Sequence, residues 1–128
     1  MDAYTIKNLK ELEDMAPRFG LAPDLEARFA RSDLECQQTG LSYQRLAPNA
    51  AGRFGHTHHQ DEEVYVVLSG SGRMKLADET VEIGPWDAIR VAPSTFRAFA
   101  AGAEGLELLA FGTHTENDGA VSDVEWGD

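Results

Sequence analysis

The feature that most constrains this chain is a succession of short apolar segments divided by turn residues. From Gly40 onward, segments such as residues 64–68 (Val-Tyr-Val-Val-Leu) are rich in β-branched and aromatic side chains, and residues 69–72 (Ser-Gly-Ser-Gly) follow as a break. Residues 77–79 separate two further segments as a hairpin turn would, and residues 84–85 (Gly-Pro) end the second one. Turn signals at intervals of about 8–12 residues predict an all-β fold, an antiparallel sandwich or barrel.

Length and charge limit the classes of protein that this chain can belong to. It has 128 residues, which suits a single domain. Its 11 basic and 22 acidic residues give a net charge of −11, which repels nucleic-acid phosphates and anionic membrane surfaces. The single cysteine, Cys36, allows neither an intrachain disulfide nor a cysteine-based metal cluster. No apolar run approaches the ~20 residues of a membrane span, so we expect a cytoplasmic protein without nucleic-acid or membrane partners.

The chain divides into three stretches of different character. Residues 1–40 are expected to form an extension that packs on the barrel, with a short helix after Asn8 and a strand near Leu25–Phe29. Residues 41–112 carry the β pattern and are expected to form the barrel. Residues 113–128 contain acidic side chains but no lysine or arginine, which predicts a solvated acidic tail.

Ionisable side chains concentrate where residues 56–59 (His-Thr-His-His) precede an acidic turn. Residues two apart in a strand share a face, so His56 and His58 should point the same way. The next strand returns antiparallel and brings a carboxylate of residues 61–63 beside them. Two imidazoles and one carboxylate on one side of an ion suit Fe(II) and also accommodate Mn, Ni, Zn or Cu. The same residues could form a solvated turn with incidental ion pairs, and spacing alone leaves both interpretations open.

The order of these residues resembles the first motif of the cupin superfamily. Residues 52–58 (Gly-Arg-Phe-Gly-His-Thr-His) are followed after four residues by Glu63 and after six more by Gly70. The resemblance implies metal ligands at His56, His58 and Glu63. It also implies a double-stranded β-helix, the cupin or jelly-roll barrel, with a ligand pocket at its centre and a homodimeric assembly. Members include dioxygenases, isomerases, decarboxylases and binding proteins without enzymatic activity, so the fold does not define one function.

Residues 84–97 resemble the second cupin motif, with two departures from its pattern. Ser94 stands where a glycine is common, and Arg97 stands where the family has a histidine as its fourth metal ligand. A guanidinium stays protonated and is not a metal ligand. In one arrangement, a divalent ion lies on the three ligands of the first motif, and Arg97 binds an anionic substrate on the open side of the ion. In the other, no metal binds, and Arg97 forms a buried ion pair with Glu63.

Two more residues are candidates for substrate binding. Arg45, in the middle of a predicted strand, either faces solvent or binds an anion, and Tyr65 is placed to line the interior. The other side chains expected to line the interior, mainly as core packing, are Tyr43, Met74, Phe96 and Phe99.

Two functions follow from the resemblance. The first is a metal-dependent enzyme of the dioxygenase or isomerase type that uses Fe, Mn, Ni or Zn, without an organic cofactor, on a small anionic organic molecule. The alternative is a metal-free cupin that binds a small ligand and has the Glu63–Arg97 ion pair in place of the metal.

Overall fold

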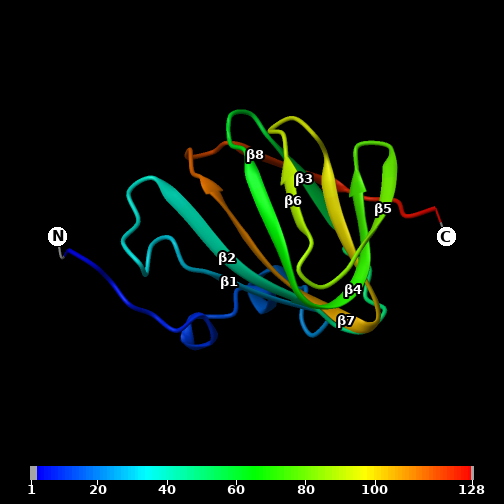
Figure 1. The fold of residues 1–128 in the computed structure, drawn as a ribbon, viewed down its shortest axis with the longest axis horizontal. Helices are drawn as coiled ribbons and strands as arrows, with labels where there is room; N and C mark the ends of the chain where they lie inside the picture. The colour runs from blue at the N-terminus through cyan, green and yellow to red at the C-terminus, as the bar shows by residue number, and fades with distance from the viewer. Residues whose placement is uncertain (1–2, 128) are drawn as a thin grey trace.

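The computed structural model describes residues 3–127 and consists largely of β-strands (Figure 1). Two 3-10 turns, η1 (Leu9–Glu11) and η2 (Ala16–Phe19), come first. No helix within residues 3–127 has the length and apolar character needed to cross a membrane. The strands in this range are β1 (Leu25–Phe29), β2 (Thr39–Leu46), β3 (Phe54–His58), β4 (Glu63–Leu76), β5 (Glu79–Ile83), β6 (Ala88–Val91), β7 (Arg97–Thr113) and β8 (Gly119–Asp123).

The long strands β4 and β7 run through both layers of the fold. Residues 63–70 of β4 pair with residues 106–112 of β7, and residues 72–76 pair with residues 97–101. In the first zone, β2 and β1 extend the sheet beyond β7, and β6 extends it beyond β4. In the second zone, β5 lies beyond β4, and β3 followed by β8 lies beyond β7. The sheet therefore curls into two antiparallel layers (Figure 1), which confirms the expected all-β, double-stranded β-helix.

The turn of β4 from one layer to the other depends on glycine. Its register against β7 shifts between Val67 and Ser69 and again between Gly70 and Gly72, as it does at β-bulges. Gly70 has a φ of +77°, in the left-handed region that favours glycine. A Cβ at Gly70 would also collide with the carbonyl group of Gly105 in β7. The two strands can therefore bend together only where side chains are missing.

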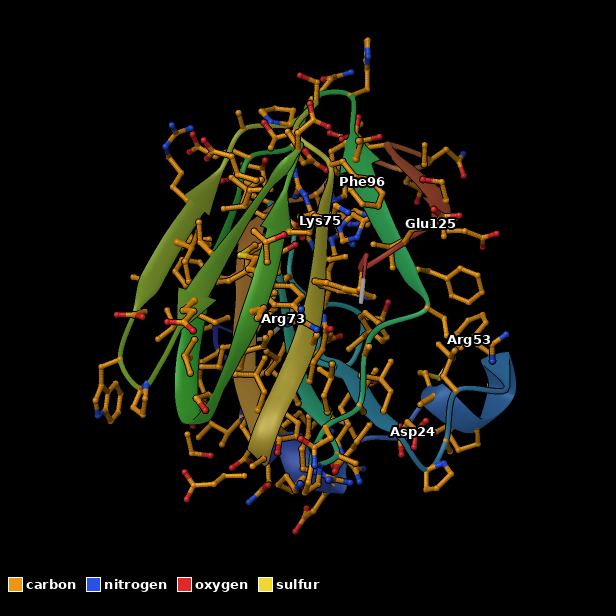
Figure 2. The ribbon with its side chains drawn as sticks, turned by 90° about the vertical axis from the view of Figure 1, so that its right-hand side faces the viewer. Asp24, Arg53, Arg73, Lys75, Phe96 and Glu125 are labelled. Atoms are coloured by element: carbon orange, nitrogen blue, oxygen red, sulfur yellow. The ribbon has the colours of Figure 1, made fainter. Side chains whose placement is uncertain are left out.

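The core fills the space between the two layers. Tyr65 and Val67 of β4 and Leu108 of β7 belong to the first layer, and Met74 and Phe99 belong to the second. The rings of Tyr65 and Phe99 meet edge to face, with centroids 4.9 Å apart. Each buried side chain of this size stabilises the fold by about 1.5–3 kcal/mol. Met74 and Phe99 thus take the core positions that the sequence predicts for them. Phe96, just before β7, is half-buried and lies against Gly55 of β3 (Figure 2).

Tyr43 lies on the outer face of β2, in contrast to the interior position expected from the pattern. Leu46 packs in the core, so the residues at odd positions before it point outward. Arg45, which was expected either to face solvent or to bind an anion, points outward. Its Nε donates to Glu26 of β1 at 3.0 Å. Lys10 of η1 donates to the same carboxylate at 2.8 Å. The N-terminal segment therefore covers this face, and Tyr43 is buried although it faces outward.

Strand β8 comes from the stretch expected to be an acidic tail. It pairs with β3 along the full length of both strands, and the C-terminal segment (red in Figure 1) runs beside β3. Further along, the indole Nε1 of Trp126 donates to the carbonyl group of Gly52 at 2.9 Å. All five residues of β8 are exposed, so the strand is held by backbone pairing. It therefore has no apolar alternation from which the sequence could have predicted it.

The requirement for glycine at the bend can be tested by substitution. We expect Gly70→Ala to lower the free energy of unfolding by about 2 kcal/mol or more, because it combines a left-handed φ with a backbone collision. Urea denaturation measures this difference. Gly84→Ala is the control, because a Cβ there meets no atom within 4 Å, and we expect a change within about 0.5 kcal/mol. Equal losses in the two variants would contradict this explanation of the bend.

Glu26 links the N-terminal segment to the sheet by charge. Burial raises the pKa of its carboxyl group, but hydrogen bonds from Lys10, Arg28 and Arg45 outweigh burial, and the pKa falls from 4.5 to about 2. A group with a lowered pKa in the folded state adds stability above its unfolded pKa and loses that contribution as the pH falls through its folded pKa. The contribution of Glu26 is therefore present above pH 4.5 and disappears towards pH 2.

We accordingly expect the melting temperature of the wild type to exceed that of Glu26→Gln near neutral pH and to converge with it near pH 2. Thermal unfolding followed by circular dichroism over this range measures the convergence. Glu13→Gln serves as the control, because Glu13 lies in an ion pair in which both side chains are more than half exposed. A constant gap between wild type and Glu26→Gln at all pH values would show that the charge of Glu26 is not the cause.

Candidate metal centre

The predicted ligands meet at the end of the fold opposite the bend, where side chains of the two layers face each other. His56 and His58 are two residues apart on β3 in the second layer, and their rings stand edge to face with centroids 4.9 Å apart. Arg97 begins β7 in the same layer and is paired in register with His56. Glu63 begins β4 in the first layer. The antiparallel return inferred from the sequence thus brings a carboxylate to both imidazoles.

One oxygen atom, Oε1 of Glu63, is the point on which this cluster converges. Nε2 of His56 and Nε2 of His58 each lie 3.2 Å from it. The phenol of Tyr65 donates to it at 2.6 Å, and Nη1 of Arg97 donates to it at 2.7 Å. The carboxylate is thus held by one cation and one neutral donor, while two imidazole nitrogens face it.

Arg97 is fully buried, and backbone carbonyl groups take most of its remaining donors. Its Nη2 donates to Ala92 at 2.8 Å and to Pro93 at 3.1 Å, and its Nε donates to Thr95 at 3.0 Å. These three carbonyl groups belong to the loop between β6 and β7. Arg97 therefore forms the Glu63–Arg97 ion pair expected in the metal-free arrangement, through one nitrogen, and also fixes the neighbouring loop.

The environment keeps Glu63 ionised and Tyr65 protonated. Burial raises the pKa of Glu63, but hydrogen bonds from His56 and Tyr65 and the charges of the two histidines outweigh it, and the pKa falls to about 2. Burial, together with the charge of Glu63, raises the pKa of the Tyr65 phenol. Tyr65 therefore acts as a hydrogen-bond donor beneath the carboxylate and is not a base at neutral pH.

His58 lies between two carboxylates, and only one of them was expected. Its Nε2 faces Glu63, and its Nδ1 lies 3.4 Å from Oδ2 of Asp118. Both ring nitrogens are buried, and neither has a hydrogen bond of acceptable geometry. Burial raises the pKa of Asp118, but backbone hydrogen bonds from Asp61 and Gln60 outweigh it, and the pKa lies below its usual range.

The donor set fits a divalent metal ion. The donor atoms of His56, His58 and Glu63 all lie within 4.8 Å of one another. Ligands about 2.1 Å from an ion at right angles to each other lie about 3 Å apart, close to the 3.2 Å between each Nε2 and Oε1. An ion would also give the unbonded Nε2 of His58 a partner, and buried polar atoms normally have one.

The residues proposed to bind substrate are distributed unevenly about this centre. Tyr65 and Arg97 touch Glu63, but both are almost completely buried, with exposures of 1% and 0%. Arg45 lies on the outer face of β2, bonded to Glu26, and is not part of the cluster. Their roles in binding a substrate stay predictions.

Asp118 was not identified from the sequence. It lies in the stretch of acidic residues that was assigned to a tail, and 60 positions separate it from His58. Nothing in its local sequence distinguishes it from the other acidic residues there. Only the pairing of β8 with β3 brings it to the site.

Comparison with known proteins gives a family and a set of similar folds. The sequence model of the cupin domain family matches residues 42–112. No curated protein sequence matches the chain.

Several solved structures are similar in fold. A cupin protein from Bacteroides fragilis is 22% identical, with a TM-score of 0.73 over 91% of this chain and 89% of that one. The polyketide cyclase RemF from Streptomyces resistomycificus is 20% identical, with a TM-score of 0.76 over 97% of this chain and 87% of that one. Oxalate decarboxylase from Bacillus subtilis is 21% identical, with a TM-score of 0.72 over 91% of this chain and 32% of that one. Identities this low establish a shared fold only.

The buried ion pair can be tested by removing its cation. We expect Arg97→Ala to lower the free energy of unfolding by about 3–5 kcal/mol, because it leaves the Glu63 charge buried without its cation. Arg90→Ala is the matched control. Arg90 pairs with Glu62 at 3.2 Å, both side chains are more than half exposed, and such a pair contributes at most about 1 kcal/mol.

Adding Glu63→Gln to Arg97→Ala should recover part of the lost stability, because no buried charge then remains without a partner. Chemical denaturation of the three variants measures the effect. An Arg97→Ala variant no less stable than Arg90→Ala would contradict the role of the buried pair.

Proposed function

The chain belongs to the cupin superfamily, and from this premise we propose that it binds one divalent metal ion and acts on a small anionic organic molecule. His56, His58 and Glu63 are the ligands in this proposal. Arg97 and Tyr65 hold the Glu63 carboxylate in place from its buried side. Arg45 lies on the outer face, bonded to Glu26, and this proposal gives it no role.

A single observation carries the proposal. Two imidazole nitrogens, those of His56 and His58, lie at the same 3.2 Å from one carboxylate oxygen of Glu63, and the nitrogen of His58 is buried without a hydrogen bond. A solvated turn with incidental ion pairs would leave these atoms in water. Two histidines and one carboxylate form a set that suits Fe(II) and accommodates Mn, Ni or Zn, with positions left open for other ligands.

The charges of the site favour an anionic substrate. Arg97 already neutralises Glu63 through the 2.7 Å contact, so the carboxylate cannot fully offset the charge of a divalent ion. The centre therefore retains positive charge on its open side, where a carboxylate, enolate or phosphate group is attracted. Because the guanidinium is fully buried, the proposal has Arg97 act on the substrate through Glu63, and a direct contact with the substrate stays a prediction.

The reaction that we propose is of the dioxygenase or isomerase type. When bound, a divalent ion supplies a Lewis acid that stabilises negative charge on a substrate oxygen. Tyr65 keeps its proton and orients Glu63, and the burial of Tyr65 and Arg97 keeps water from that side of the carboxylate. One of the proteins of similar fold is named as an oxalate decarboxylase, and oxalate is a small anion of the kind that these charges favour here.

A second function rests on a different observation. The 2.7 Å ion pair between Arg97 and Glu63 already neutralises the carboxylate, so the cluster does not need a cation for its stability. A metal-free cupin would use His56 and His58 as polar groups that bind a ligand. With its side chain 33% exposed, His56 is the more accessible of the two and could exchange a proton with that ligand.

Metal content separates the two functions. We expect untagged protein incubated with Fe, Mn, Ni or Zn to retain about one equivalent of metal, because three donor atoms converge on one point. The His56→Ala/His58→Ala variant should lose it, since one carboxylate remains. His59→Ala/His114→Ala is the control, because it removes two histidines that are exposed and should leave the metal content unchanged. Elemental analysis of the dialysed proteins measures all three.

Absence of metal from the wild type under every condition would overturn the metal-dependent function and leave the metal-free one. A thermal-shift screen with small mono- and dicarboxylates would then test the remaining proposal. Metal retained equally by the His56→Ala/His58→Ala variant would show that the ion binds elsewhere.

A further inference from the structure

We propose that Asp118 is the positioning residue of this centre, fixing the ring of His58 so that its Nε2 is presented to the metal ion. The inference rests on the proposed function and deepens it. It assigns a role in the site to the C-terminal stretch, which by composition is only an acidic tail.

The attachment of β8 brings Asp118 to the far side of His58. β8 pairs antiparallel with β3, and Gly119 lies opposite His58 in the register. The backbone N–H of His59 donates to the carbonyl group of Asp118 at 3.0 Å. Asp118 therefore enters the site one residue before β8 begins, with Oδ2 at 3.4 Å from Nδ1 of His58.

Asp118 is itself held rigidly. Its side chain is 3% exposed. The backbone N–H of Gln60 donates to its Oδ1 at 2.9 Å, and that of Asp61 donates to its Oδ2 at 2.8 Å. These donors lie in the loop that joins β3 to β4, between the two histidines and Glu63. The carboxylate thus ties the loop between the proposed ligands to the C-terminal strand.

The approach to Asp118 is fixed by a second buried carboxylate. Asp61 is 3% exposed, and it accepts from the hydroxyl groups of Thr113 and Thr115 at 3.1 and 3.0 Å and from the N–H of Thr115 at 2.8 Å. The chain between β7 and β8 is therefore anchored at its start by Asp61 and at its end by Asp118. Moving Asp118 away from His58 would require these hydrogen bonds to break.

The same hydrogen bonds disfavour a separate metal site at His58, Asp61 and Asp118. The donor atoms of these three residues also lie within 4.8 Å of one another. Every carboxylate oxygen of Asp61 and Asp118 already accepts from a backbone or hydroxyl donor. These hydrogen bonds already stabilise both carboxylates, so neither needs an ion as its partner, and in our proposal Asp118 supports the ligand His58.

The carboxylate of Asp118 selects the form of the His58 ring that can bind a metal. A neutral imidazole has one N–H and one free lone pair. Oδ2 of Asp118 lies 3.4 Å from Nδ1, without hydrogen-bond alignment, and its negative charge favours a proton on that nitrogen. Oε1 of Glu63, on the other side of the ring, already accepts from Tyr65 and Arg97, so the proton is favoured on Nδ1 and the lone pair is left on Nε2. That lone pair faces Oε1 of Glu63 at 3.2 Å. A metal cation bound there would accept electron density from both Nε2 and Oε1. Carboxylates that hold a metal-binding histidine in this way typically strengthen metal affinity by about 10- to 100-fold.

The first test compares the affinity of three proteins for Zn²⁺, measured by competition with a chromophoric chelator. We expect Asp118→Asn to weaken binding by about 10- to 100-fold. Asp123→Asn is the matched control, because Asp123 lies on the same strand and is exposed, and its affinity should equal that of the wild type. Thermal unfolding of each metal-free protein shows whether it is folded. Asp118→Asn is chosen because the amide keeps the shape of the side chain.

The second test reads the ring of His58 directly in the metal-free protein. Long-range ¹H–¹⁵N spectra distinguish Nδ1–H from Nε2–H imidazoles, at a pH well above the usual imidazole pKa of about 6.5. We expect the Nδ1–H form of His58 in the wild type and in Asp123→Asn, and a larger share of the Nε2–H form in Asp118→Asn. A residue that only anchors a loop would not move this signal.

These readouts separate failure of the inference from failure of the proposed function. If the wild type binds no Zn²⁺, the metal-binding function falls, and the spectra still decide whether Asp118 sets the His58 ring. If the wild type binds Zn²⁺ while Asp118→Asn shows the same affinity and the same ring form, the inference is overturned and the metal site stands. A lower melting temperature alone, with both readouts unchanged, would make Asp118 a loop anchor and would also overturn the inference.

Discussion

The buried ion pair between Glu63 and Arg97 is the interaction on which the rest of this site depends. Glu63 comes from one layer of the fold and Arg97 from the other, so the 2.7 Å contact bridges the layers at the end opposite the glycine bend near Gly70. With a second nitrogen, Nη2, Arg97 holds the loop that leads into β7. Burying two charges is costly, and the cost is offset only when the geometry is good and the remaining donors are satisfied. Both conditions hold here, which gives this end of the barrel a fixed shape.

The same pair decides which cluster can form around it. Because Arg97 and Tyr65 both donate to one oxygen of Glu63, that oxygen is fixed at the point where His56 and His58 arrive from β3. The contacts that fix Glu63 come from the chain's own residues, a condition that favours binding and catalysis alike. Two features of the site act in opposite directions on metal binding. The ion pair with Arg97 neutralises Glu63 without a metal ion, whereas the buried, unbonded Nε2 of His58 would gain a partner if a metal ion bound.

Sequence reasoning succeeded where chemistry and strand alternation pointed the same way. The spacing of His56 and His58 predicted a shared face, and a return strand was expected to bring a carboxylate. It failed for Tyr43, because the apolar residues of β2 do not alternate in one consistent phase, and a shift of one position reverses inside and outside. The outward phase holds because the N-terminal segment covers that face, through Lys10 and Glu26. That contact joins residues 16 positions apart and has no local signature.

The sequence by itself determined the all-β class, through local alternation and turn residues. The spacing of its motif resembles that of the cupins, and this resemblance identified the three candidate ligands. It also showed that Arg97 stands in place of a fourth ligand. Only the tertiary structure decided what Arg97 does, since its partners come from the facing strand and from carbonyl groups of a loop. Only the tertiary structure placed Asp118 beside His58, because backbone pairing of an exposed strand leaves no trace in residue types. Contacts made by side chains of distinctive chemistry can be read from a sequence, whereas contacts made by backbone register cannot.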